Sequence, residues 1–377
     1  MVNVKQFHLD KVLFIIVIIL FVAGSVVMYS ASTSQHADSS HYLKRHLVNG
    51  TIAVMLGILF SRFPHQYFRH LRHVILIGMY LLLIGVLVYN KVQGLTHPAR
   101  WLYIGGFSFQ VADFVRLGMI IFIADYLNRH QDTLTDLKKS VLPAFFLVST
   151  VVAFIAIQPD LSSSLMIMML CLILFYLGNV QISHISAFLS VGSITALIYA
   201  WSKPYMWKRI MTFFSDNVDV ANEGFQVHHS LMGLAHGGIG GVGLGNSYVK
   251  DLFLPEPHTD FVFSILGEEF GFIGSALFLL LYLLLFLRGL RIARNSSDSF
   301  TMLLAIGISF SLFSFAMVNI GVVTGFLPTT GLPLPLISYG GSNLLATAVM
   351  LGILFNISST NESGKVLSSE RVLNIDF

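Results

Sequence analysis

The chain has 377 residues, of which 55% are hydrophobic and 11% charged, whereas a soluble globular protein usually carries about 25% charged residues. Its net charge of +3 is small, and no stripe of Lys and Arg indicates a nucleic-acid surface. The single cysteine, Cys171, lies in an apolar run, which excludes disulfides within the chain and Cys-rich zinc sites. The composition therefore indicates an integral membrane protein.

Ten apolar segments predict membrane-spanning helices, each of which needs roughly 20 apolar residues. In chain order they lie near 12–30, 47–61, 73–90, 111–128, 141–158, 163–179, 184–201, 261–287, 300–321 and 342–358. No small-residue cleavage pattern follows the first segment, so we expect a span there and not a cleaved signal. Pro159 breaks the helical pattern between the fifth and sixth segments, where a re-entrant turn is the alternative to two spans.

The predicted fold is thus an all-α, polytopic membrane protein with about ten transmembrane helices. We divide it into an N-terminal segment 1–11, a transmembrane region 12–358 and a tail 359–377. Most of the 22 Lys and Arg residues fall on the side that holds both ends, with basic clusters at 62–72 and 288–294. Because cytoplasmic loops carry the excess of Lys and Arg, both termini are predicted to be cytoplasmic.

The longest connection, residues 202–260, joins the seventh and eighth predicted helices and faces the extracytoplasmic side on this topology. Connections longer than about 15 residues are usually functional or disordered. This one contains many glycines and aromatic residues, among them Trp207, Phe213 and Phe225. We therefore expect an ordered cap that is partly associated with the membrane.

Asp260 is the strongest candidate for chemistry, because it lies at the outer mouth of the eighth predicted helix. Helical spacing places five small residues on its face, and Phe261, Ile265 and Phe272 elsewhere. These residues are Ser264, Gly267, Gly271, Gly274 and Ser275. A carboxylate at this boundary could act as general base for a sugar hydroxyl. The alternatives are an acid that complements the helix dipole and a packing face of small residues.

Five further charged residues lie within or beside predicted spans, where an unpaired charge costs at least about 2.5 kcal/mol. Glu268 and Glu269 need partners or water. Asp113 and Arg116, three residues apart, suit a structural ion pair, a polar pathway, or a contact of Arg116 with a substrate phosphate. Asp160 could cap the next helix through backbone N–H groups near Ser162 and Ser163.

The glycine-rich run 237–245 contains the spacing G-x-G-x-x-G, but no βαβ pattern surrounds it, so it does not indicate a dinucleotide site. We expect these glycines to allow close backbone approach or sharp bends, or to free N–H groups that bind an anion such as pyrophosphate. The spacing of His228, His229, His236 and His258 fits no zinc motif.

Ordered motifs along most of the chain resemble the SEDS family of polytopic proteins, FtsW, RodA and SpoVE. They are Met28-Tyr29-Ser30-Ala31-Ser32, Arg100-Trp101-Leu102 with Gln110, Asp113, Phe114 and Arg116, Gln158-Pro159-Asp160, Gly243-Leu244-Gly245-Asn246-Ser247, Leu254-Pro255-Glu256, His258-Thr259-Asp260-Phe261, Gly267-Glu268-Glu269, Leu327-Pro328-Thr329-Thr330-Gly331 and Pro335-Leu336-Ile337-Ser338-Tyr339-Gly340-Gly341-Ser342. Gly-Leu-Gly-Asn-Ser and Gly-Glu-Glu are closer to the division and sporulation branch than to RodA.

Some positions depart from the family pattern. Asp113 and Arg116 stand where Glu and Lys are usual, so both charges are kept. Val111 and Ala112 replace Pro and Ser, Ser162 replaces Gly, and Pro257 replaces Ala before the His. These departures put the fine geometry of the helices in doubt more than the activity.

The resemblance implies a peptidoglycan glycosyltransferase that polymerises lipid II at the outer face of the bacterial inner membrane and releases undecaprenyl pyrophosphate. It assigns the family's essential Asp to Asp260. Candidates for substrate binding are Arg100, Lys208, Arg209, Lys250, His258 and Glu256. A divalent cation, Mg or Mn, is a candidate to share the neutralisation of pyrophosphate. The implied partners are a class B penicillin-binding protein, which is a transpeptidase, and other division proteins of the membrane.

Two other functions stay open from the sequence. Charged residues within spans also suit a lipid II flippase with a polar translocation path. A non-enzymatic scaffold for division proteins would need no reactive acid. The resemblance to the division and sporulation branch favours septal cell-wall synthesis in cell division, with sporulation and elongation as the alternatives.

Overall fold

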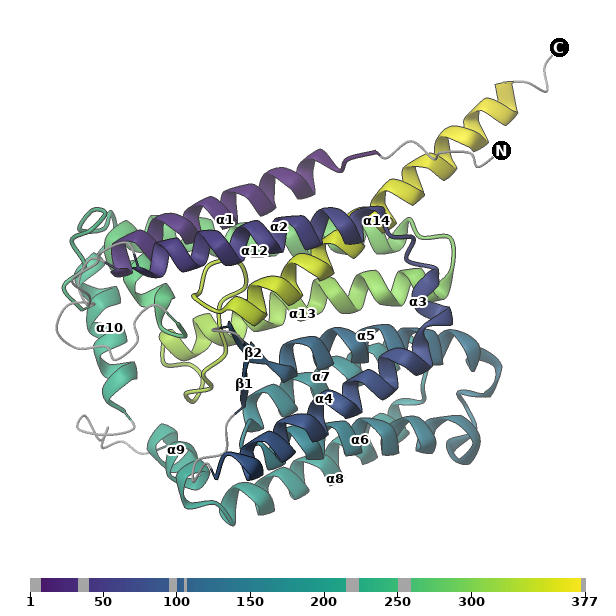
Figure 1. The fold of residues 1–377 in the computed structure, drawn as a ribbon, viewed down its shortest axis with the longest axis horizontal. Helices are drawn as coiled ribbons and strands as arrows, with labels where there is room; N and C mark the ends of the chain where they lie inside the picture. The colour runs from purple at the N-terminus through teal and green to yellow at the C-terminus, as the bar shows by residue number, and fades with distance from the viewer. Residues whose placement is uncertain are drawn as a thin grey trace.

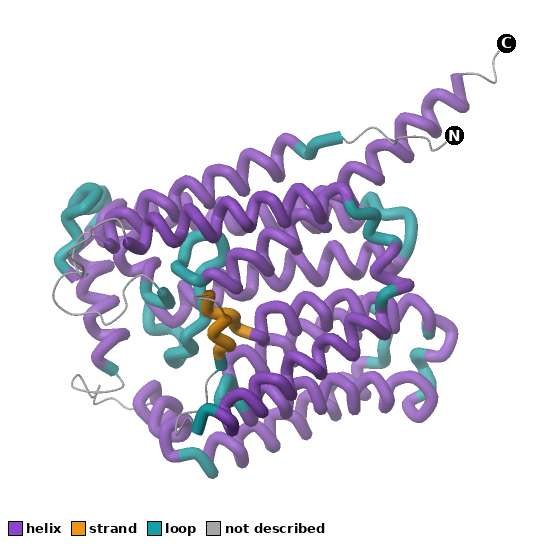
Figure 2. Tube along the Cα trace, in the orientation of Figure 1, coloured by secondary structure: helices purple, strands orange, loops and turns teal. Residues whose placement is uncertain are grey.

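The computed structural model describes residues 8–32, 41–94, 100–104, 107–214, 224–249 and 259–373. Figure 1 shows a bundle of long helices that run side by side, and Figure 2 shows that helices make up most of this part of the chain. The helices that match the ten predicted spans are α1 (Lys11–Ser32), α2 (His41–Arg62), α4 (Arg72–Val92), α5 (Val111–Arg129), α6 (Leu142–Ile157), α7 (Leu161–Leu177), α8 (Ile182–Trp201), α12 (Val262–Arg294), α13 (Ser299–Val323) and α14 (Gly341–Leu373).

Eight helical segments within the described residues are long and apolar enough to cross a membrane by length and composition. The other two matches, α5 and α7, differ for separate reasons. Helix α7 has only 17 residues, and α5 contains four charged side chains. Apolar residues on all sides of the remaining helices explain why they form buried or lipid-facing spans.

The packing separates an inner group of helices from an outer one. Helix α5 is buried on nearly all sides and packs against α13, α4, α7 and α14. Helix α8, by contrast, buries only Ala200 and exposes apolar side chains such as Ile194 and Leu197. A helix that exposes apolar side chains along its length is suited to contact with lipid.

Both termini lie at one end of the bundle (Figure 1). There, Arg288 donates to both carboxylate oxygens of Asp10 at 2.9 and 3.0 Å, and Ser358 donates to Asp10 at 2.9 Å. The segment expected as a tail is helical as far as Leu373, because α14 continues through it. The even number of long helices explains why the two ends meet on one side.

The opposite end carries the connections. Helices α9 (Pro204–Phe214) and α10 (Phe225–Gly237) belong to the long connection expected between the seventh and eighth helices. They lie at the end of the bundle away from the termini, as does an antiparallel hairpin of β1 (Trp101–Ile104) and β2 (Phe107–Gln110) (Figure 1). The hairpin is a local addition to the predicted all-α fold, and its two four-residue strands leave little periodicity in the sequence. At the other end are α3 (Tyr67–His70), a 3-10 turn (Gln131–Thr133) and a π-helical turn (Leu137–Val141).

Candidate active site

Asp260 lies in the turn that leads into α12, and it is half-buried. Thr259 donates a hydrogen bond to its Oδ1 at 2.6 Å. The amide of Asn319 on α13 donates to the backbone carbonyls of Asp260 and Leu332, at 2.8 and 2.7 Å. Asn319 therefore fixes the main chain of Asp260 and does not bind its carboxylate.

The second carboxylate oxygen, Oδ2, has no hydrogen-bond partner within the described part of the chain. Gly331 faces it closely, since a Cβ atom at this residue would lie 3.6 Å from Oδ2. Gly331 also has φ +70°, a conformation that favours glycine. The arrangement leaves one oxygen of Asp260 free to accept a proton.

The small residues expected on the face of Asp260 pack against α10. Ser264 donates to the carbonyl of Ser230, and a Cβ at Gly237 would meet the Gly267 carbonyl at 2.2 Å. Gly271, with φ +67° and ψ −166°, interrupts the helix within this face, yet Ser275 still lies beside Gly267, where a Cβ would be 3.2 Å from its Oγ.

Glu268 is completely buried and accepts hydrogen bonds from four groups. His236 Nδ1 of α10 and the backbone N–H of Tyr248 approach Oε1 at 2.8 and 3.0 Å. The Ser247 hydroxyl and the backbone N–H of Val249 donate to Oε2. A buried carboxylate needs such donors, because burial without them is costly.

Glu269, the adjacent acid, connects α12 with the first helix. The hydroxyl of Ser30 on α1 and the backbone N–H of Gly245 both donate to its Oε1. Together, Glu268 and Glu269 hold the segment 245–249 against α12.

The glycine-rich segment 237–245 crosses the break in α12. Val242 and Gly243 donate backbone hydrogen bonds to the carbonyls of Glu268 and Glu269, each at 3.0 Å. A Cβ at Gly241 would lie 2.2 Å from the Glu269 carbonyl oxygen. The expected close backbone approach is confirmed, and side chains are excluded because the two main chains touch.

Asp113 and Arg116 lie inside the bundle between α5, α13 and α14. Ser342 and Asn343 of α14 donate to Asp113 at 2.9 and 3.2 Å, and the nearest approach of Arg116 to Asp113 is 4.0 Å. The guanidinium of Arg116 is 1% exposed, has no hydrogen-bond partner among the residues that the structure describes, and lies 3.8 Å from the centre of the Phe315 ring. The ring face therefore stabilises this cation, together with Asp113.

Asp160 occupies the start of α7, where it accepts from the Ser163 N–H at 3.1 Å, the capping bond expected from the sequence. Gln110, at the end of the hairpin, donates to its other oxygen at 2.9 Å, and Arg100 approaches at 3.8 Å. Asp160 thus joins the hairpin to α7, and Arg100 has a carboxylate neighbour.

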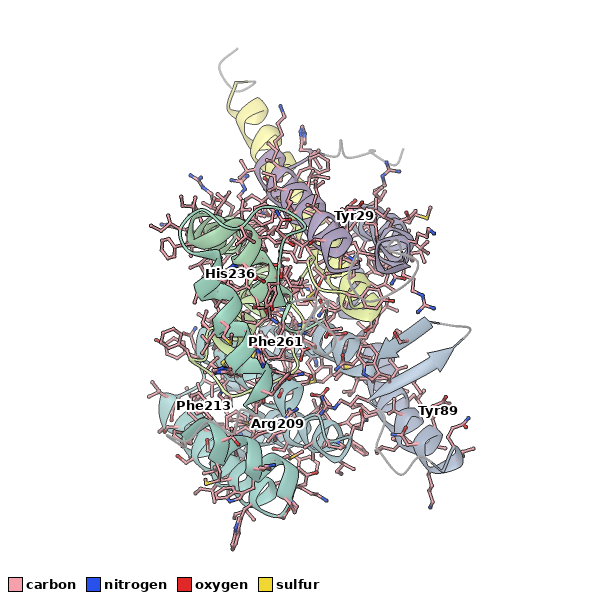
Figure 3. The ribbon with its side chains drawn as sticks, turned by 90° about the vertical axis from the view of Figure 1, so that its left-hand side faces the viewer. Tyr29, Tyr89, Arg209, Phe213, His236 and Phe261 are labelled. Carbon is pink, nitrogen blue, oxygen red and sulfur yellow. The ribbon has the colours of Figure 1, made fainter. Side chains whose placement is uncertain are left out.

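Lys208 and Arg209, the other described candidates for substrate binding, lie on α9, with Lys208 exposed and Arg209 half-buried. Figure 3 views the end opposite the termini, where Arg209, His236 and Phe261, the residue after Asp260, are labelled. Lys250, Glu256 and His258 lie outside the described residues.

The described part of the chain contains no group of three His, Cys, Asp or Glu side chains that could hold a metal ion. Burial and the neighbouring His228 lower the pKa of His229 on α10. Mg²⁺ is often held by one or two carboxylates together with substrate phosphates, so a divalent cation beside Asp260 and a bound pyrophosphate stays a prediction.

Two residues that position the site were missed by sequence analysis. Asn319 of α13 fixes the main chain of Asp260, and His236 of α10 binds Glu268. Asparagine in a predicted span is a polar residue in an apolar run, which was a usable signal. In the sequence, His236 is one of several histidines in a long connection, and its spacing does not indicate that Glu268 is its partner.

The fold and this arrangement define a multi-pass membrane protein with a half-buried acid at the end of the bundle away from its termini. A family profile named for FtsW, RodA and SpoVE, and described as "Cell cycle protein", matches residues 10–363. The chain belongs to this family.

Similar proteins cover nearly the whole chain. Stage V sporulation protein E of Bacillus subtilis (strain 168) is 34% identical over 94% of this chain and 98% of its own length. A "Probable peptidoglycan glycosyltransferase FtsW" of Wigglesworthia glossinidia brevipalpis is also 34% identical, over 93% of both chains. Both relatives belong to the sporulation and division branch expected from the sequence.

Two solved structures share the fold. One comes from work on "Structural coordination of polymerization and crosslinking by a peptidoglycan synthase complex", with a TM-score of 0.79, 26% identity and coverage of 94% of this chain and 99% of that chain. The Thermus thermophilus Rod shape determining protein RodA has a TM-score of 0.69 at 25% identity and covers 94% of this chain and 97% of its own.

Proposed function

We propose that this protein is a peptidoglycan glycosyltransferase that polymerises lipid II at the outer face of the cytoplasmic membrane, with both of its termini in the cytoplasm. The observation that carries the proposal is Asp260, whose main chain is fixed by Asn319 while its Oδ2 stays open beside Gly331. Relatives named probable peptidoglycan glycosyltransferases support the reaction class.

Asp260 acts as the general base. Its open Oδ2 accepts the proton of the acceptor sugar hydroxyl, and the hydroxyl oxygen attacks the anomeric carbon of the donor. A new glycosidic C–O bond forms while the bond between that carbon and the pyrophosphate breaks. The pair of electrons leaves with undecaprenyl pyrophosphate, and Thr259 orients the carboxylate through Oδ1.

The leaving pyrophosphate needs positive charge, which we assign to basic residues at the same end of the bundle. Lys208 is exposed on α9, where a phosphate can reach it, and Arg209 lies beside it. Arg100 has Asp160 within 3.8 Å, so its charge is partly neutralised before substrate binds. We assign Lys250 the same role from the sequence.

A class B penicillin-binding protein is the proposed partner, because a transpeptidase would cross-link the strands that this chain makes. The similar structure from a complex that couples polymerisation and crosslinking supports this pairing. Similarity to FtsW and to Stage V sporulation protein E favours synthesis at a septum, together with other division proteins of the membrane.

The experiment is lipid II polymerisation by purified protein, alone and with its transpeptidase partner carrying an inactivated active site. We expect Asp260→Ala and Asp260→Asn to lower the rate about 100- to 10,000-fold, the usual contribution of a general base. Asp132→Asn, an exposed acid at the opposite end, is the matched control. Undiminished polymer from a folded Asp260→Ala variant would overturn the assigned role.

A lipid II flippase is the second candidate, and the buried pair Asp113 and Arg116 is the observation that favours it. Charges inside a bundle can line a polar path through the membrane. A flippase would move labelled lipid II across sealed vesicles and make no polymer. A scaffold would do neither and would still recruit its partners after neutralisation of Asp260.

A further inference from the structure

A groove of about 320 Å³ lies between α1, α2 and α14, away from the candidate active site. Small residues form its floor, since Gly352 of α14 approaches the backbone of Gly57 so closely that a Cβ would lie 2.5 Å from its carbonyl oxygen. Its walls are apolar side chains such as Phe14 and Ile58, which are 43% and 50% exposed. Exposed apolar walls on membrane-spanning helices mean that the groove opens to lipid.

The groove has the length of one acyl chain. Along α2 its lining runs from Gly50 to Arg62, which is about 18 Å at a rise of about 1.5 Å per residue. One leaflet contributes half of a hydrocarbon core of about 30 Å.

Arg62 lies at the end of the groove that shares its side with both termini, together with Leu9 and Ser61. Its side chain is exposed and has no acidic partner in the described part of the chain. Two other arginines at this end are paired, Arg69 with Asp298 and Arg288 with Asp10. Arg62 is therefore a groove-lining cation without an acidic partner among the described residues, so an anion from the membrane can pair with it.

We propose that this groove binds one acyl chain of an anionic phospholipid from the leaflet on the side of the termini, with its phosphate at Arg62. Basic pockets between transmembrane helices bind anionic head groups in this way. The apolar walls hold the chain, and the guanidinium selects the charge. The proposal stands independently of the reaction assigned to Asp260.

The test measures lipid retention by native mass spectrometry of protein released from nanodiscs that contain equal amounts of phosphatidylglycerol and phosphatidylcholine. We expect wild type to retain one phosphatidylglycerol in preference to phosphatidylcholine. Arg62→Gln removes the selecting charge and lowers that preference about fivefold, the effect of one basic residue near an anionic head group. Arg294→Gln, an exposed arginine at the same end outside the groove, leaves the preference unchanged.

A second substitution tests the apolar part of the site. Gly57→Leu fills the groove and lowers retention of both lipids, whereas Gly85→Leu on α4, where a Cβ meets open space, does not. Gly57→Ala, whose Cβ makes an ordinary contact at 3.5 Å, narrows the groove without disturbing the fold and gives an intermediate result. Equal preference in Arg62→Gln and Arg294→Gln, or no preference in wild type, overturns the proposal.

Discussion

Asp260 and Glu268 are eight residues apart at the same end of α12, yet their surroundings differ. Asp260 is half-buried, and within the described residues its side chain has one hydrogen bond, from Thr259. Glu268 is fully buried and accepts from two side chains and two backbone N–H groups. Glu268, whose two oxygens both accept hydrogen bonds, holds residues 247–249 against α12. Asp260, whose Oδ2 has no partner among the described residues, can take part in a reaction.

The largest effect on stability is expected at Gly241, where the glycine-rich segment that leads to the donors of Glu268 touches α12. Gly241→Ala combines φ +81° with a clash against the Glu269 carbonyl, and strain and overpacking each cost about 1–3 kcal/mol. We expect the free energy of unfolding, measured by thermal unfolding in detergent, to fall by roughly 2–4 kcal/mol. Gly240→Ala, whose Cβ meets open space, is the control. Equal stability of the two variants would refute the close approach.

Glu268→Gln tests the saturated carboxylate directly. The side-chain amide nitrogen of Gln is a donor, and it would face one of the donors that now bind the Glu268 carboxylate. At least one hydrogen bond to a charged group is therefore lost. We expect a loss of about 1.5–3 kcal/mol in the same unfolding measurement. A variant as stable as wild type would mean that the four hydrogen bonds contribute little.

A smaller effect on stability is expected at Arg116, the buried cation of α5. Phe315→Leu removes the ring face beneath Arg116, an interaction of about 0.5–2 kcal/mol, in addition to the packing loss. Phe263→Leu, at another buried ring without a ring or cation contact among the described residues, measures packing alone. The excess destabilisation of Phe315→Leu over Phe263→Leu isolates the contact with Arg116, and no excess would disprove it.

The smallest effect on stability is expected at Asp260 itself. Asp260→Asn keeps the shape of the side chain at a half-buried position, so unfolding changes by less than about 0.5 kcal/mol. The same variant is expected to lose polymerisation. A strongly destabilised Asp260→Asn variant would show that Asp260, like Glu268, stabilises the fold, and would contradict the difference inferred between the two acids.

Most of the fold was predictable because spans depend on length and hydrophobicity, both of which are visible in the sequence. The ten long helices correspond to the ten apolar segments. The hairpin 101–110 was not predictable, because its pairing depends on a neighbouring segment and each strand has only four residues. The break at Gly271 depends on Ile239 and Gly241, which lie about 30 residues earlier in the chain.

The candidate site was predictable to a different degree. Asp260 stood out as an acid at a membrane boundary, and Glu268 as an acid that needs partners. The identity of those partners was not predictable, since His236 and Asn319 approach from other helices. The role of Asp10 was missed for the same reason, because its partner Arg288 lies 278 residues away in the chain.

The hydrogen bond between Ser30 and Glu269 has a consequence for how the protein is made. The two residues are 239 positions apart, so helix α1 enters the membrane long before α12 has been synthesised. Chains are produced at about 5–20 residues per second, and early segments therefore wait for roughly 10–50 s. The segment 242–249 cannot dock until α12 has followed, because it binds to Glu268 and Glu269. The candidate site thus matures late in biogenesis, when the chain is nearly complete.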